Sequence, residues 1–221
     1  IIPSIILSII LSIILSIMLS IISIMLSIIL SIIIIIRMRM ISNMDRKIWF
    51  VRHAQSDYNK KKLFTGWHDP DLTQHGIHIA HELKEELYGT KFDKVFSSPL
   101  KRALSTAKIL IDDQEIVIDD RLKERSYGDW SAKSKEEVKS LVGEESYYSA
   151  RRGWETSPPN GESLKDVSLR VKPFIDELPD TGNILVVSHG NTIRAISVLF
   201  GVNTQENVKT FEIKVGTVLK V

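Results

Sequence analysis

The sequence predicts an α/β protein, a three-layer α/β/α sandwich around a mostly parallel sheet. Short apolar runs typical of buried strands alternate with segments whose apolar residues recur at helical spacing, the pattern of a sheet covered by helices. Two of the runs, ending at residues 51 and 187, are followed closely by a histidine and small polar residues. Ligands of open α/β sheets bind beyond the carboxyl ends of the strands, so we expect both histidines in one crevice.

The first half of the folded part alternates strands and helices. Residues 47–51 predict a buried strand, and residues 71–76 open a helix that runs to Leu87 and stops at Gly89. A second strand is expected at 94–98. Pro99 then takes a first-turn position, where proline is favoured, in a helix that reaches Leu110. Residues 116–118 predict a third strand.

The second half begins with a polar segment. Residues 121–159 are rich in charges, Tyr and Trp, and we expect them to form an inserted lid or helical excursion. Helical spacing returns over 163–178. Residues 184–187 predict a fourth strand followed by a helix over 192–200, and residues 210–215 a last strand, at an edge or antiparallel.

Composition limits the class of protein. The chain of 221 residues has no cysteine, which excludes disulfides, thiol nucleophiles and Cys-ligated zinc and fits a cytoplasmic protein. Every acidic residue follows residue 43, and only Arg37 and Arg39 among the basic ones precede it, so the charges of the remainder balance. A balanced domain gives no reason to expect a nucleic acid partner. Residues 44–221 have the size of a single catalytic domain.

Residues 1–43 are set apart as a low-complexity segment, since residues 1–36 are almost entirely Ile, Leu and Ser. Three interpretations stay open: an upstream stretch outside the working protein, a membrane anchor, and an aggregation-prone tail. We favour the first, because the chain begins with Ile and Met44 stands just before the first strand, as a translation start would. A membrane partner is expected only if residues 1–36 are a real anchor.

The residues around the two histidines are suited to phosphoryl transfer. Arg52 immediately precedes His53, and Gly190 immediately follows His189. An imidazole beside a guanidinium suits the capture and covalent transfer of a phosphoryl group. The loop after His53 offers hydroxyl, amide and backbone donors for phosphate oxygens, at Ser56, Asn59, Thr65 and Gly66.

Two more residues complete the expected chemistry. Arg102 lies in the helix that follows Pro99, near its electropositive end, and so can point at the same anion. A carboxylate near these cations, for which Glu124 is our candidate, would take and return the proton of the acceptor hydroxyl. We expect no metal site, because His75, His78 and His81 step by three around a polar helix surface.

Five motifs stand in the order found in the histidine phosphatase superfamily, and the match runs from about Ile48 to Val221. They are Arg52–Ser56 (RHAQS), Phe64–Asp69 (FTGWHD), Ser97–Ala103 (SSPLKRA), Glu124–Gly128 (ERSYG) and Ser188–Asn191 (SHGN). More narrowly, the chain resembles the 2,3-bisphosphoglycerate-dependent phosphoglycerate mutases. The sharper signals for this subgroup are Phe64-Thr65-Gly66-Trp67, Lys135 eleven residues after Glu124, and Arg151-Arg152-Gly153.

The resemblance implies a role for each site residue. His53 would be the phosphorylated nucleophile and His189 its partner, with Arg52 and Arg102 as phosphate clamps and Glu124 as proton donor and acceptor. The remaining positions would hold the carboxylate and other phosphate of the substrate: Tyr127, Lys135, Arg151, Arg152 and Asn191. The three added cations favour a bisphosphorylated acid over a generic phosphomonoester.

The expected activity is interconversion of 3-phosphoglycerate and 2-phosphoglycerate in glycolysis and gluconeogenesis. 2,3-Bisphosphoglycerate would prime the phosphohistidine as cofactor, no metal would take part, and residues 125–159 would exclude water. The alternative is a histidine phosphatase acting on phosphomonoesters or sugar bisphosphates, and the third hypothesis is a non-catalytic module that binds phosphorylated ligands. The partner is a small phosphorylated substrate, and the protein is expected to be a monomer or homodimer.

The chain departs from the family pattern in a few places. Ala54 replaces the usual glycine after the nucleophile, and Tyr58 stands where tryptophan is typical. The sequence lacks the stretch that longer mutases carry between Pro159 and Gly161, and it stops at Val221 without their C-terminal tail. It therefore resembles the compact members, and a missing tail would favour hydrolysis beside mutase activity.

Overall fold

The computed structural model describes residues 2–42 and 46–221, with side chains described for 9–36 and 46–221. The chain consists of two compact units, with the boundary between residues 45 and 46. The expected domain boundary after residue 43, with the translation start at Met44, lies outside the described residues and stays a prediction.

The N-terminal unit is one helix, α1 (Ile2–Ser42). Within it, Ile9–Ile36 is long and apolar enough to cross a membrane by length and composition, and none of that stretch is buried. A signal sequence near an N-terminus passes the same test, so this finding by itself is weak evidence for an anchor. Arg37 and Arg39 follow this apolar stretch, and their side chains lie outside those described.

The second unit is built on a five-stranded sheet in the order β3-β2-β4-β1-β5. The strands are β1 (Arg46–Arg52), β2 (Lys94–Ser97), β3 (Val117–Ile118), β4 (Gly182–Ser188) and β5 (Val218–Lys220). β1, β2, β3 and β4 pair in parallel, whereas β5 pairs antiparallel with β1 at the edge. The expected mostly parallel sheet is confirmed.

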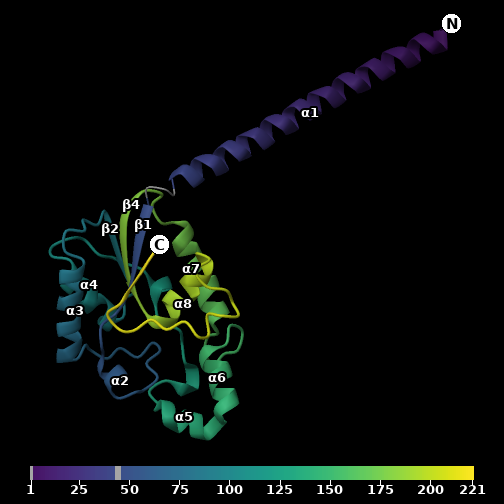
Figure 1. Cartoon of the computed structure of the whole chain (residues 1–221). Coiled ribbons are helices and arrows are strands. Elements are labelled where there is room, and N and C mark those ends of the chain that lie inside the picture. Colours follow the sequence, from purple (N-terminus) through teal and green to yellow (C-terminus); the bar gives the residue numbers. More distant parts are fainter. Residues whose placement is uncertain (1, 43–45) are drawn as a thin grey trace. The chain divides into compact units, whose positions relative to one another are not determined.

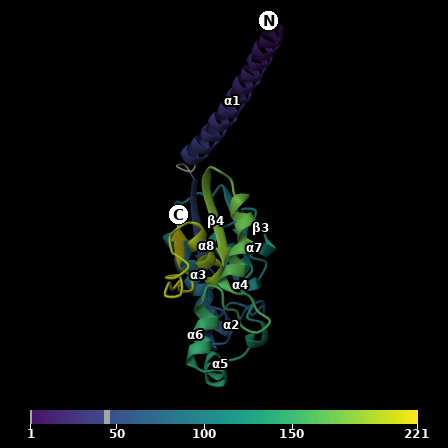
Figure 2. The same cartoon turned by 90° about the vertical axis from the view of Figure 1, so that its right-hand side faces the viewer.

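Helices cover both faces of the sheet and gather at one end of it. α3 (Gln74–Glu86) and α4 (Lys101–Leu110) lie on one face, and α7 (Leu164–Asp176) and α8 (Gly190–Leu199) on the other (Figure 1). The remaining helices, α2 (Asp57–Lys60), α5 (Lys135–Val142) and α6 (Glu144–Arg152), stand at the same end of the unit in both views (Figure 2). Two short 3₁₀ turns, Asp120–Leu122 and Gly128–Trp130, connect β3 to α5.

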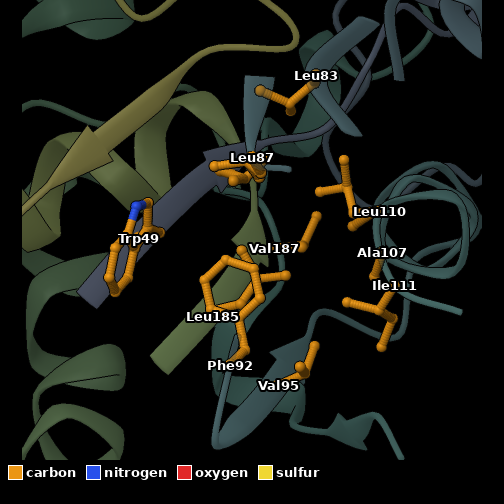
Figure 3. Close-up of a cluster of buried hydrophobic side chains, with 12 residues drawn as sticks. Trp49, Leu83, Leu87, Phe92, Val95, Ala107, Leu110, Ile111, Leu185 and Val187 are labelled. Atoms are coloured by element: carbon orange, nitrogen blue, oxygen red, sulfur yellow. The ribbon is translucent and has the colours of Figure 1, made fainter. Parts of the chain in front are cut away.

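Two apolar cores fix the sheet between its helices. On the α3/α4 face, Trp49 and Val51 of β1 and Leu185 and Val187 of β4 pack with side chains from both helices. Figure 3 shows Trp49, Leu185 and Val187 in this cluster. Alternate residues of the same strands enter the core under α7 and α8, which explains why residues 48–51 of β1 and 184–187 of β4 are all apolar. A third cluster, around Phe64, joins the segments that carry α5 and α6 to the domain.

The elements expected from the sequence are present, with two errors, in the strand at 210–215 and in the position of Pro99. Residues 121–159 do form a helical excursion. Residues 210–215 are wrong as a strand, because they form a loop, and the last strand is β5, which is both antiparallel and at the edge. In that loop the carbonyls of Phe211 and Ile213 accept hydrogen bonds from arginine side chains instead of a neighbouring strand. Pro99 precedes α4 instead of lying in its first turn.

Candidate active site

The two motif histidines meet because β1 and β4 are parallel neighbours. Arg52 at the end of β1 pairs with Ser188 at the end of β4, so His53 and His189 leave the sheet side by side. Both side chains are buried, and their ring centroids lie 5.0 Å apart at an angle of 61°. The topology thus brings together residues 136 positions apart, at the strand ends where ligands of this architecture bind.

The hydrogen bonds of His53 define its tautomer. Nδ1 lies 2.7 Å from the carbonyl oxygen of Ala54, and since a carbonyl can only accept, Nδ1 carries the proton. The Nε of Arg102 donates to Nε2 of His53 at 3.2 Å. Burial, and then the charges of Arg102 and Arg52, hold the pKa of His53 well below its usual value. His53 is therefore a neutral imidazole with its Nε2 lone pair turned toward Arg102, the state that a nucleophile needs.

Arg102 is a fully buried guanidinium held in place by backbone carbonyls. Nη1 donates to the carbonyl of His68 at 2.8 Å, and Nη2 donates to that of Gly66 at 2.9 Å. Gly66 has a φ of 51°, a left-handed conformation that favours glycine. Burial lowers the pKa of Arg102 to about 10, which leaves it charged at neutral pH. The predicted clamp is thus a fixed positive charge beside the predicted nucleophile, His53.

Arg52 keeps one buried donor without a partner among the described residues. Nη1 donates to the carbonyl of Ile213, whereas the buried Nε has no hydrogen-bond partner in the described part of the chain. Gly190 allows this position, because a Cβ there would lie 3.3 Å from the guanidinium carbon of Arg52. A buried donor without a partner favours a missing anion as its ligand.

His189 lies behind His53 and begins α8. Its Nε2 lies 2.8 Å from the hydroxyl of Ser98, which follows β2, and its Nδ1 has no partner among the described residues. Burial, followed by the charge of Arg102, holds the pKa of His189 well below its usual value. The residue does not line the cavity wall, so its direct neighbour in the site is the His53 ring.

Glu124 is fixed over the start of α8. Its Oε1 accepts from the backbone N–H groups of Arg125 at 2.7 Å and Asn191 at 3.2 Å. The indole Nε1 of Trp67 donates to the carbonyl of Glu124 at 2.7 Å, and Arg170 of α7 donates to the carbonyls of Arg121 and Lys123. These bonds leave Oε2 as the oxygen free to exchange a proton.

A cavity of about 190 Å³ unites most of the predicted residues. Its predicted lining residues are Arg52, His53, Asn59, Thr65, Arg102, Glu124, Tyr127, Lys135, Arg151, Arg152, Gly190 and Asn191. Ser56 and Gly66 do not line it. The backbone N–H and the hydroxyl of Ser56 both donate to Oδ1 of Asn59 at 3.1 Å, at the start of α2. The carbonyl of Gly66 accepts from Arg102.

Lys135, Arg151 and Arg152 form a second group of cations on the wall of this cavity. Lys135 begins α5, and the two arginines end α6, so the helical excursion delivers all three. Burial, followed by the charge of Arg151, lowers the pKa of Lys135 to about 8. Tyr127 and Asn191 lie on the same wall, where the amide Nδ2 of Asn191 donates to the Tyr127 hydroxyl at 2.9 Å.

Five lining residues were missed by the sequence prediction: Leu63, Phe64, Arg194, Glu212 and Ile213. Arg194 stands three residues after Asn191 on α8, so helical spacing was the signal that could have found it. Its Nη1 donates to the Asn191 amide oxygen at 3.3 Å. Glu212 and Ile213 belong to the loop wrongly expected as a strand, and no local pattern places them at the site.

Among the described residues, no group of three or more His, Asp or Glu side chains lies close enough together to hold a metal ion. His75, His78 and His81 are exposed on α3, as expected for solvated residues, and His78 pairs with Glu82 at 3.3 Å.

Comparisons with known proteins identify the family of this chain. The family model of the histidine phosphatase superfamily (branch 1) matches residues 48–221. The 2,3-bisphosphoglycerate-dependent phosphoglycerate mutase of Rhizobium etli is 39% identical over 185 residues, which cover 78% of this chain and 88% of the relative. That of Beijerinckia indica is 40% identical over 188 residues, covering 80% and 91%.

Solved structures with the same fold are named as phosphatases, unlike the relatives above. A mycobacterial glucosyl-3-phosphoglycerate phosphatase superposes with a TM-score of 0.73 at 25% identity, covering 79% of this chain and 89% of that one. A putative alpha-ribazole-5'-P phosphatase from Escherichia coli gives 0.69 at 31% identity, covering 80% and 89%. With the family model matched over the whole sheet and both histidine motifs, the chain is an enzyme of the histidine phosphatase superfamily, branch 1.

Proposed function

We infer that this enzyme interconverts 3-phosphoglycerate and 2-phosphoglycerate through a phosphohistidine at His53. The observation that carries this proposal is the single cavity that joins the His53 pocket to Lys135, Arg151 and Arg152. The residues around His53 would bind the phosphoryl group that is transferred. Lys135, Arg151 and Arg152 would bind the carboxylate and the other phosphate of the substrate. Relatives named as phosphoglycerate mutases at about 39% identity support the same activity.

In the half-reaction that phosphorylates the enzyme, a bond forms between His53 Nε2 and phosphorus. The ester bond from phosphorus to an oxygen of the glycerate breaks at the same time. Arg52 and Arg102 bind the oxygens of the transferred group and offset its negative charge. Glu124 gives its proton to the leaving oxygen. In the other half-reaction the free hydroxyl of 3-phosphoglycerate returns a proton to Glu124 as its oxygen attacks the phosphorus on His53 and the bond from phosphorus to Nε2 breaks. The bisphosphorylated intermediate turns over in the pocket, and its other phosphate returns to His53, which releases 2-phosphoglycerate.

The residues of the cavity fit 2,3-bisphosphoglycerate as the priming molecule. It carries two phosphates and a carboxylate, and six cationic residues line the cavity: Arg52, Arg102, Lys135, Arg151, Arg152 and Arg194. Arg52 and Arg102 would hold one phosphate and Lys135, Arg151 and Arg152 the remaining anionic groups. When bound, 2,3-bisphosphoglycerate supplies the phosphoryl group that phosphorylates His53.

The described lid segment supports exclusion of water from this reaction. Arg125 is buried beneath it and donates to the carbonyls of Ala150 at 3.1 Å and Arg151 at 3.0 Å, which ties α6 to the Glu124 loop. We place the catalytic unit in the cytoplasm, as a monomer or homodimer that acts on a small phosphorylated acid.

Hydrolysis is the second candidate function, favoured by the phosphatase names of the superposed structures. It uses the same phosphohistidine but transfers the group to water. The cations on α5 and α6 distinguish the two, because a small phosphomonoester has no carboxylate or second phosphate to bind them.

The test is a coupled assay on the full chain purified in mild detergent, with 3-phosphoglycerate and a catalytic amount of 2,3-bisphosphoglycerate. We expect formation of 2-phosphoglycerate, strongly increased by the bisphosphate, and acid-labile phosphate on His53. His53→Ala should lose the phosphoenzyme and turnover, while the matched control His81→Ala on exposed α3 should keep both. Release of inorganic phosphate without 2-phosphoglycerate would instead establish the phosphatase.

A further inference from the structure

A short segment of the C-terminal loop is held across the cavity by arginines of the site. The three bonds are Arg194 Nε to the carbonyl of Phe211 at 2.7 Å, Arg152 Nη2 to Oε1 of Glu212 at 2.8 Å, and Arg52 Nη1 to the carbonyl of Ile213. The two outer bonds hold the backbone, whereas the middle one is an ion pair between side chains. The segment therefore delivers one carboxylate to the cation cluster.

Glu212 and Glu124 are the two carboxylates among the residues that line the cavity. Glu124 is fixed by backbone N–H groups at the start of α8, whereas Glu212 meets the group of cations made by Lys135, Arg151 and Arg152. A negative charge there is unfavourable for an anionic ligand, so its presence needs an explanation.

The ion pair is unequal in its exposure to solvent. The Arg152 side chain is 16% exposed and the Glu212 side chain is 69% exposed. The hydrogen bond from Arg152, followed by its charge, lowers the pKa of Glu212, so the carboxylate is ionised at neutral pH. Exposed pairs contribute little to stability, so a carboxylate from solution can replace that of Glu212 at small cost.

Space exists for the displaced side chain. A second, more open cavity of about 420 Å³ shares five lining residues with the first: Arg52, Asn59, Lys135, Glu212 and Ile213. Lys214 lines only the second cavity, so a Glu212 side chain that leaves Arg152 turns toward another cation. The backbone bonds of Phe211 and Ile213 need not break for this movement.

We propose that Glu212 is a specificity-determining residue that occupies Arg152 as an internal substitute for the substrate carboxylate. A ligand must carry its own carboxylate to replace it, and its affinity is reduced by that competition. Such competition also speeds release of the product acid. The inference rests on the proposed function only in naming 3-phosphoglycerate as the ligand, because binding is measured without turnover.

The experiment compares two ligands that differ in the carboxylate. 3-Phosphoglycerate and glycerol 3-phosphate share the phosphate and the neighbouring hydroxyl, but the second has a hydroxymethyl group in place of the carboxylate. Their dissociation constants are measured calorimetrically on the unphosphorylated full chain in detergent. In Glu212→Gln we expect 3-phosphoglycerate to bind about two- to fivefold more tightly relative to glycerol 3-phosphate, the range of an exposed ion pair.

A double-mutant cycle isolates the contact from the general field of the charge. In the Arg152→Ala background, Glu212→Gln should leave the ratio of the two affinities unchanged, because the site of competition is gone. Glu206→Gln is the matched control, an exposed acid on the same C-terminal segment that lines neither cavity, and it should behave as the parent.

Three results would overturn the proposal. Equal tightening of both ligands would mean that Glu212 acts only through its charge. Weaker binding of 3-phosphoglycerate in Glu212→Gln would mean that the carboxylate contacts the ligand itself. If glycerol 3-phosphate binds and 3-phosphoglycerate does not, phosphorylated carboxylic acids are the wrong ligand class. A failed mutase assay together with the expected ratio of the two affinities would refute only the proposed function.

Discussion

The Nε of Arg102 donates to Nε2 of His53 at 3.2 Å, so the proposed phosphate clamp and the proposed attacking nitrogen face one another. Two backbone carbonyls fix the other end of the same guanidinium. Because the arginine cannot move far, a phosphoryl group must enter between fixed groups. Such preorganised charge accounts for much of the rate enhancement of phosphoryl transfer.

Arg102→Ala should lower kcat/KM by about 10²–10³-fold, the usual cost of removing one fixed donor from a transition state. It should also raise the pKa of His53, since the charge of Arg102 lowers it. The measurement is the pH profile of phosphoenzyme formation in a single turnover. Lys101→Ala, the exposed neighbour on α4, is the control, and equal losses in both variants would contradict the clamp.

Arg151→Ala should reduce mutase activity roughly 10- to 150-fold more than hydrolysis of a small aryl phosphate, because a charge-assisted contact to the carboxylate contributes about 1.5–3 kcal/mol. The ratio of the two kcat/KM values tests this. Lys139→Ala, exposed on α5 and paired with Glu144, should keep the parent ratio. A ratio unchanged in Arg151→Ala would contradict a role in acid recognition.

Binding of 3-phosphoglycerate should weaken above pH 8, because the pKa of Lys135 is lowered to about 8 and the ammonium becomes neutral above it. Below pH 8 the lysine is charged and attracts the anion. The plot of kcat/KM against pH should therefore fall on its alkaline side by up to about tenfold per unit. Lys135→Arg should move this fall to higher pH, and Lys135→Gln should abolish it. A parent-like alkaline limb in Lys135→Gln would assign it to another group.

The free energy of unfolding should decrease as the pH falls below about 6.5. The pKa values of buried His53 and His189 are lowered in the folded protein, so the unfolded chain binds more protons in this range. Each histidine contributes a slope of up to about 1.4 kcal/mol per pH unit. Thermal denaturation of the full chain between pH 7.5 and 5 measures the loss. His189→Gln should reduce the slope, whereas His78→Gln on exposed α3 should not, and equal slopes would contradict the argument.

The sequence predicted the strands that carry His53 and His189, because strands buried on both faces are apolar at every position and end abruptly in polar residues. Its main error was the strand at 210–215. Alternating apolar residues there resemble a strand locally, but the partners of their backbone carbonyls are Arg52 and Arg194, which lie far away in the sequence.

The sequence by itself determined the fold class and the family motifs, since these depend on residue type and local spacing, and the resemblance that the motifs carry implied many of the lining residues. Only the tertiary structure decided that Glu212 meets Arg152 and that Ser56, Gly66 and His189 stand behind the cavity wall. Such contacts join residues tens of positions apart. They follow from strand order and loop path, which the packing of the whole domain sets and no local pattern encodes.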